Sequence, residues 1–64
     1  MRVGDHVRGR GFVTFRFQDV VVFNRRGMLG TTFDVVDFSE VTGGSHVASF
    51  HDRETAIRLA VATF

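Results

Sequence analysis

The first three quarters of the chain follow the two-residue period of β-strands. In segment 12–17 apolar and polar residues alternate from Val13 onward, which predicts a strand with one buried face. One face of this strand carries Val13, Phe15 and Phe17, and the other carries Thr14 and Arg16. A shorter strand is expected over Val3–Val7, with Gly9 and Gly11 separating the two strands.

The next apolar segment, Val20–Phe23, has apolar residues on both faces, as expected for the central strand of a sheet. Gln18-Asp19 is a weak break before it, because two-residue hairpin turns favour glycine. Val20–Phe23 is therefore either a separate strand or a continuation of segment 12–17. Asn24–Gly27 is predicted to be a turn, since Asn and Gly tolerate positive φ, and the chain up to Gly30 is predicted to be a loop.

Two further strands are expected in the second half of the chain. The strand Thr32–Phe38 places Phe33 and Val35 on one face and Val36 and Phe38 on the other. This arrangement indicates either a bulge near Val35-Val36 or burial of both faces. A turn at Gly43–Ser45 then leads into the last strand, His46–Phe50.

After residue 51 the hydrophobic period changes from 2 to 3.6, which predicts an amphipathic helix. Asp52 is a favourable N-cap, and Glu54 lies in the first turn, where a negative charge interacts well with the helix dipole. The stripe expected to face the core consists of Ile57, Ala60, Val61 and Phe64. The candidate residues of a protein interface, on the outer side of this helix, are Leu59, Ala62 and Arg58.

Together these elements predict an α+β fold: an antiparallel β-meander of about four strands with one C-terminal amphipathic helix packed on one face. Residues 1–64 are expected to form a single small domain. A chain of this size buries only about 60% of the surface that its unfolded form exposes, and without cysteine it has neither a disulfide nor a thiolate metal site. Self-association as a homodimer is therefore a candidate source of stability.

The basic residues are all arginine, and they are concentrated in the first half of the chain. Residues 1–30 carry six arginines against two aspartates, a net charge of +4, whereas residues 31–64 carry two arginines against five acidic residues, a net charge of −3. This asymmetry predicts either a basic surface for an anionic partner or a bipolar molecule that binds copies of itself. Arginine without lysine is also typical of GC-rich genomes, so an actinobacterial or phage-like source is our hypothesis. Selection for the planar guanidinium group would give the same composition.

Arginines and phenylalanines are interleaved in segment 8–17, a pattern suited to nucleic acid, because guanidinium groups bind phosphates and aromatic rings stack on unpaired bases. The candidate nucleic-acid-binding residues are Arg8, Arg10, Arg16, Arg25 and Arg26. Segment Arg10–Phe15 resembles a shortened RNP1 motif of the RRM family, with two middle positions missing. The chain is too short for the RRM topology, so we do not assign it to that family. The alternative interpretation is structural: Phe15 and Phe17 face the core, and the arginines protect a sheet edge from aggregation.

The sequence lacks the patterns of catalytic and metal sites. No metal-ligand spacing is recognised among the three histidines, His6, His46 and His51. Ser49, His51 and Asp52 are the residue types of a hydrolytic triad, but they are too close in sequence to face one another as a triad does. The Gly-x-Gly at 9–11 is not followed by a helix, so it is no phosphate-binding loop. We therefore expect no enzymatic activity, no cofactor, no metal and no small-molecule substrate.

No apolar run reaches the roughly 18 residues of a membrane span, and the first residues lack the apolar segment of a signal peptide. We therefore expect a cytoplasmic protein without membrane contact, acting as a small binding or regulatory module. Its expected partner is either nucleic acid, bound by the arginine-rich N-terminal face, or a protein, bound by the C-terminal helix. The sequence does not separate these two alternatives.

Overall fold

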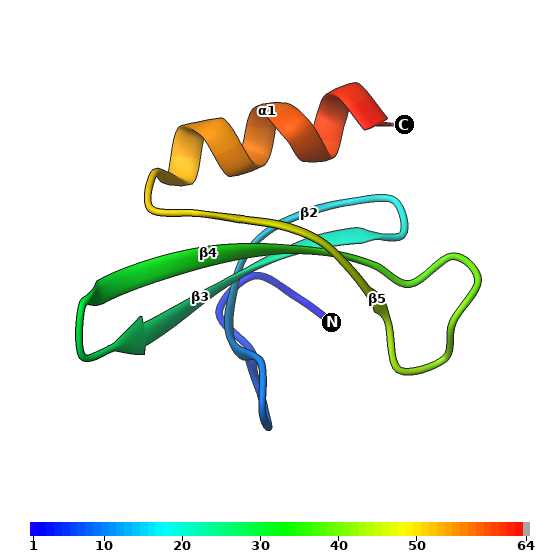
Figure 1. The fold of residues 1–64 in the computed structure, drawn as a ribbon. Helices are drawn as coiled ribbons and strands as arrows, with labels where there is room; N and C mark the ends of the chain where they lie inside the picture. The colour runs from blue at the N-terminus through cyan, green and yellow to red at the C-terminus, as the bar shows by residue number, and fades with distance from the viewer. Residues whose placement is uncertain (64) are drawn as a thin grey trace.

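The described residues form five antiparallel strands followed by one helix that lies across one side of the sheet (Figure 1). The computed structural model describes residues 1–63, and the side chains of residues 1–62. The elements are β1 (His6–Val7), β2 (Gly11–Phe17), β3 (Val20–Gly27), β4 (Gly30–Asp37), β5 (Ser45–Phe50) and α1 (Arg53–Thr63). Each strand pairs with the next one in sequence, so the sheet is a meander in the order β1-β2-β3-β4-β5. The predicted α+β architecture is confirmed, with five strands where about four were expected.

β3 is the central strand, and its first four residues, Val20–Phe23, are all buried. It is a separate strand and not a continuation of β2, because Phe17 pairs with Val20 across a tight turn at Gln18-Asp19. Gln18 takes a φ of 55°, a left-handed conformation that glycine usually supplies in such turns. The predicted central strand is thus confirmed, and the open alternative at Gln18-Asp19 is resolved in favour of a hairpin.

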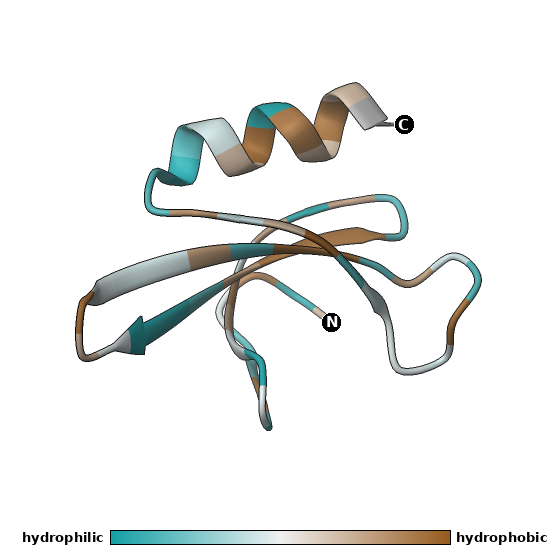
Figure 2. Ribbon diagram, in the orientation of Figure 1, coloured by the Kyte–Doolittle hydropathy of each residue, from teal (hydrophilic) through white to brown (hydrophobic). Residues whose placement is uncertain are grey.

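Two hydrophobic clusters lie on the two sides of the sheet, because neighbouring residues of β3 and β4 point to opposite faces. The helix-side cluster contains Val20, Val22, Val35, Ala56 and Ala60, with Phe15, Phe33, Phe50 and Leu59 packed against it. The far-side cluster contains Val13, Val21, Phe23 and Val36, with Val7 and Phe38 packed against it. Figure 2 shows the corresponding hydrophobic centre of the strands and of α1.

The far-side cluster is enclosed because the sheet curls around it. The guanidinium of Arg10, in the β1–β2 turn, donates a hydrogen bond to the carbonyl oxygen of Gly43, in the β4–β5 loop, at 2.9 Å. These two segments lie at opposite ends of the strand order. Inside the curl, the rings of Phe23 and Phe38 meet edge to face, with their centroids 6.2 Å apart.

The alternation predicted for β2 is wrong at one position. Val13 packs in the far-side cluster, whereas Phe15 packs in the helix-side cluster. The pairing of β2 with β3 shifts register between these two residues, so Thr14 is an extra residue that has no partner on β3. A bulge of this kind reverses the faces of the residues that follow it.

The turn predicted at Asn24–Gly27 is also wrong. These residues belong to β3, and the chain reverses at Met28-Leu29, with Gly27 paired to Gly30. Pairing with β4 extends β3 through this polar segment, since all eight of its residues have partners. The turn is made possible by Gly30, which takes a φ of 116°.

Both interpretations offered for Val35-Val36 hold. Val35 and Val36 are buried on opposite sides of β4, and the pairing with β5 shifts register between them. The extra residue, Val47, lies on β5, because Val35 pairs with Ala48 and Val36 pairs with His46. The turn before this strand spans Val41–Gly44, closed by a hydrogen bond from the Gly44 N–H to the Val41 carbonyl at 2.9 Å, so the turn predicted at Gly43–Ser45 is placed too late, because Ser45 already belongs to β5. Gly44 takes a φ of 85° there.

The predicted helix and its cap are confirmed. Asp52 Oδ2 accepts hydrogen bonds from the Thr55 backbone N–H at 3.0 Å and from the Thr55 hydroxyl at 2.6 Å. These bonds satisfy a donor that the first turn of a helix otherwise leaves unpaired.

The predicted inner stripe of the helix is correct at Ala60 and wrong at Val61. Ala56 and Ala60 are fully buried and Leu59 packs against the helix-side cluster, whereas Val61 is 45% exposed. The placement of Leu59 on the outer face is therefore wrong as well. The two fully buried positions of α1 are thus both alanines. The prediction for Phe64 lies outside the described residues.

Candidate nucleic-acid interface

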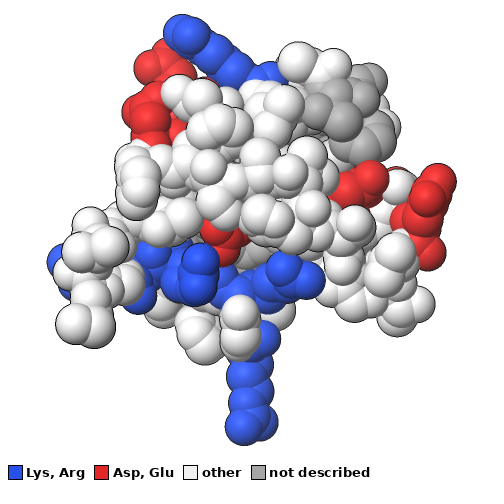
Figure 3. Space-filling model, viewed as in Figure 1, with Lys and Arg blue, Asp and Glu red and all other residues white. Residues whose placement is uncertain are grey.

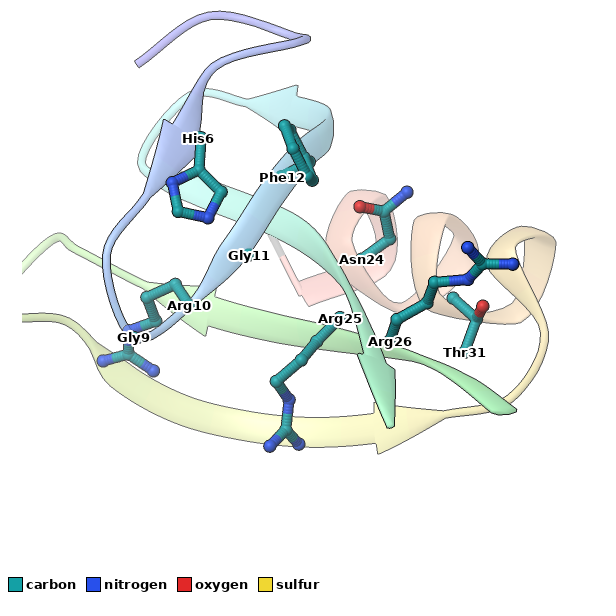
Figure 4. Close-up of a pocket in the computed structure, with 9 residues that line it drawn as sticks. All are labelled: His6, Gly9, Arg10, Gly11, Phe12, Asn24, Arg25, Arg26 and Thr31. Atoms are coloured by element: carbon teal, nitrogen blue, oxygen red, sulfur yellow. The ribbon is translucent and has the colours of Figure 1, made fainter. Parts of the chain in front are cut away.

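A groove of about 480 Å³ lies between the β1–β2 hairpin and the β3–β4 hairpin. It is lined by His6, Gly9, Arg10, Gly11, Phe12, Asn24, Arg25, Arg26 and Thr31 (Figure 4). The lining contains three arginines and no carboxylate, so the groove is cationic. All of these lining residues lie in the first half of the chain, in which the sequence concentrates its positive charge.

Two glycines and one backbone hydrogen bond shape the β1–β2 side of the groove. The Arg10 N–H donates to the Val7 carbonyl at 2.9 Å, which closes the turn, and Gly9 takes a φ of 79°. Gly11 takes a φ of 108°, and its α-carbon faces the backbone carbonyl of Asn24 so closely that a side chain would overlap this oxygen. This close approach brings Phe12 and Asn24 together as partners across β2 and β3.

The groove contains an exposed aromatic pair. Phe12 is 53% exposed, and its ring meets the His6 imidazole edge to face, with the centroids 4.9 Å apart. Figure 4 shows these two rings together, with Asn24 and Arg26 beyond them. Phe12 was not among the predicted site residues. The signal that could have found it is its place in the alternating pattern, on the polar face of the strand.

The other phenylalanines of β2 are less accessible. Phe15 packs against the helix-side cluster, which confirms its predicted place in the core, and Phe17 is half-buried at the end of the strand. The interleaved pattern of arginine and phenylalanine therefore does not form one continuous binding strip along β2.

The five predicted arginines separate into two groups. Arg10, Arg25 and Arg26 line the groove, whereas Arg8 is an exposed residue of the β1–β2 turn and is not part of the lining. Arg16 is elsewhere: its guanidinium donates to the carbonyl oxygens of Gln18, at 3.0 Å, and Met1, at 3.1 Å.

Two of the groove arginines also bind protein groups. Arg25 Nε lies 3.3 Å from Asp34 Oδ2, and Arg10 Nη2 donates to Gly43. Figure 4 shows both guanidinium groups extending away from the rings, whereas Arg26 extends on the side of Asn24. For Arg26 the described residues supply no hydrogen bond or ion pair, so its five donors face solvent.

Positive and negative side chains occupy different parts of the surface. In Figure 3 most of the arginine atoms gather below the layer of α1, and most of the acidic atoms lie at the upper left and at the right edge. The charge asymmetry of the sequence is therefore also an asymmetry in space.

A chain of hydrogen bonds on the far side of the sheet holds Asp34 in place. Ser49 Oγ donates to Asp34 Oδ1 at 2.7 Å, and His46 Nε2 lies 2.7 Å from the same hydroxyl oxygen. Because a serine hydroxyl has a single proton, His46 is the donor in this second bond. In a hydrolytic triad the imidazole stands between the serine and the carboxylate and accepts the serine proton. Here serine stands in the middle, so the arrangement orients Asp34 and does not activate a nucleophile.

Each of the three histidines contacts a different residue, and none contacts another histidine. His6 contacts Phe12, His46 contacts Ser49, and His51 Nδ1 lies 3.3 Å from the carbonyl oxygen of Thr31. Within the described part of the chain, no group of three or more His, Asp or Glu side chains is placed to hold a metal ion.

The candidate protein interface on α1 is smaller than expected. Arg58 pairs with Glu54 at 3.2 Å on the exposed side of the helix, and Ala62 is exposed. Leu59, the largest apolar member of the predicted set, packs inward. Self-association through this helix stays a prediction.

Comparison of the chain with protein-family models, with curated proteins and with solved structures found no match. Among residues 1–63, no helix has the length and apolar content needed to cross a membrane.

Proposed function

We propose that the chain is a non-enzymatic nucleic-acid-binding module that holds a single strand in the basic groove. The observation that carries this proposal is the exposed ring of Phe12 in a groove with three arginines and no carboxylate. Unpaired bases stack on exposed aromatic rings, and guanidinium groups bind the phosphates beside them. A duplex hides the faces of its bases, so an exposed ring favours a single strand.

The groove residues have distinct roles in this proposal. Arg26 binds a phosphate with its full set of donors. Arg10 and Arg25 each use only part of their guanidinium group on Gly43 and Asp34, and their remaining N–H groups are available to neighbouring phosphates. Asn24 supplies a neutral donor and acceptor for base edges.

The test measures binding of fluorescently labelled oligonucleotides by anisotropy at several salt concentrations. With about three phosphate contacts, the logarithm of the binding constant for a single strand is expected to fall with the logarithm of salt with a slope of about −2. Arg26→Ala is expected to reduce this slope by about 0.7. Phe12→Ala is expected to weaken binding roughly tenfold or more and to leave the slope unchanged, because it removes stacking and not charge.

Arg58→Ala is the matched control, since it removes the same charge from an exposed arginine on α1, outside the groove. We expect it to bind as the unmodified protein does. The proposal is wrong if neither single-stranded DNA nor single-stranded RNA binds at low salt and high protein concentration. It is equally wrong if Arg58→Ala weakens binding as much as Arg26→Ala, because net charge alone would then explain the affinity.

A further inference from the structure

The tip of the β3–β4 hairpin carries two large apolar side chains that contact neither hydrophobic cluster. Met28 is 104% exposed and Leu29 is 96% exposed. Tight hairpin turns favour Asn, Asp and Gly, and Gly27 and Gly30 already supply the flexible positions here. Neither the turn nor the core explains two exposed apolar residues at the tip. Departures from local rules of this kind concentrate at functional sites.

The tip continues the lining of the basic groove. Asn24–Arg26 line the groove, and Met28 follows Arg26 by two residues on the same strand and turn. Arg25 lines both the groove and a second hollow of about 400 Å³ beside Met28 and Leu29. Figure 2 shows the hydrophobic turn directly next to the hydrophilic end of β3. Two strand residues span about 7 Å, which matches the rise of about two stacked nucleotides.

We propose that the partner is a junction between single-stranded and double-stranded nucleic acid. The single strand lies in the groove, and Met28 and Leu29 stack on the exposed face of the last base pair of the duplex. This inference rests on the proposed function. The end of a duplex presents the apolar face of a base pair, and proteins use apolar side chains such as Leu and Met against base steps.

A lipid surface is the competing partner for an apolar tip next to arginines. The two side chains together are smaller than a single myristoyl chain, which alone gives only marginal and reversible membrane binding. The tip is also continuous with a groove that contains an exposed aromatic ring, which a membrane would leave unused. The small apolar area of the tip and its continuity with the groove therefore favour the nucleic-acid junction.

The experiment compares three labelled oligonucleotides: a single strand, a blunt duplex, and a duplex with a single-stranded overhang. The unmodified protein is expected to bind the overhang duplex about tenfold more tightly than either of the others, as expected from burying two apolar side chains. A 2-aminopurine at the terminal base pair is expected to change its fluorescence on binding. The double variant Met28→Ser with Leu29→Ser is expected to bind the single strand normally and to lose both effects.

Val41→Ser is the matched control, because Val41 is an exposed apolar residue of the β4–β5 loop, and we expect it to keep the preference for the junction. Equal binding of the single strand and the overhang duplex refutes this inference alone, as does a preference that survives in the double variant. Failure to bind any oligonucleotide refutes the proposed function as well. Binding to vesicles of phosphatidylcholine and phosphatidylserine that requires Met28 and Leu29, without a preference for the junction, assigns the tip to membranes and overturns the inference.

Discussion

At the scale of single residues, Gly11 is the position that most directly shapes the groove. Its φ of 108° lies in a region that side chains rarely adopt, and a β-carbon there would overlap the carbonyl oxygen of Asn24. The contact is with backbone on the neighbouring strand, so the strand itself would have to move to relieve it. Strand β3 is buried on both sides just before Asn24, which leaves little room for such a movement.

We therefore expect Gly11→Ala to lower the free energy of unfolding by about 2 kcal/mol or more, from the strained φ together with the overlap. Urea denaturation followed by circular dichroism measures this change. Gly43→Ala is the control, because no positive φ is imposed there and nothing lies within 4 Å of an added β-carbon. Equal stability of the two variants would contradict the argument.

At the scale of elements, the N-cap of α1 makes the stability of the fold depend on pH. The hydrogen bond from the Thr55 hydroxyl, followed by that from its backbone N–H, lowers the pKa of Asp52 below its ordinary value of 3.8. A carboxyl group whose pKa is lower in the folded chain than in the unfolded chain stabilises the fold at pH values above its pKa in the unfolded chain. That stabilisation is lost as the pH falls through the lowered pKa that the group has in the folded chain.

The Tm of Asp52→Ala is therefore expected to lie a few degrees below that of the unmodified protein at neutral pH. The difference is expected to shrink once the pH falls below 3.8, because the protonated cap no longer accepts both bonds as a carboxylate. Thermal denaturation across pH checks this. Glu40→Ala, at an exposed position between β4 and β5, is the control. A Tm difference that stays constant from neutral to acidic pH would rule out the ionised cap as its cause.

Elements were easier to predict from the sequence than their orientations. Hydrophobic periodicity located the strands and the helix, but one unpaired residue, Thr14, placed Val13 and Phe15 on opposite sides of the sheet. A bulge depends on pairing with a neighbouring strand, so the strand's own pattern does not contain it. Likewise, the helical period predicts an inner stripe of Ile57, Ala60, Val61 and Phe64, whereas the structure buries Ala56 and Ala60 and leaves Val61 exposed.

The candidate site was predictable only in part, for the same reason. The sequence identified the arginines of the two hairpins, and three of them line one groove. Arg16 could not be separated from them, since its contacts with Gln18 and Met1 depend on the path of the chain. The sequence predicts a loop at Met28-Leu29, because the pairing that extends β3 to Gly27 depends on two strands and not on the pattern of one.

At the scale of the whole molecule, two small clusters share one sheet. β3 contributes alternate residues to both clusters, with Val22 on the helix side and Val21 on the far side, and β4 does the same with Val35 and Val36. We expect neither cluster to stabilise the fold by itself, since so small a domain is only marginally stable. Loss of packing on one side is therefore expected to weaken the other.

Val22→Ala on the helix side and Val36→Ala on the far side test this coupling. Each is expected to lower the free energy of unfolding by about 2 kcal/mol, from the lost methyl groups and the cavity they leave. Hydrogen exchange is expected to show faster exchange at the amides of both Val13 and Ala60 in either variant, because opening is global in a cooperative domain. Val41→Ala, at an exposed position, is expected to leave both amides protected. Faster exchange on only the mutated side would mean that the two clusters open independently and that the shared sheet does not couple their stability.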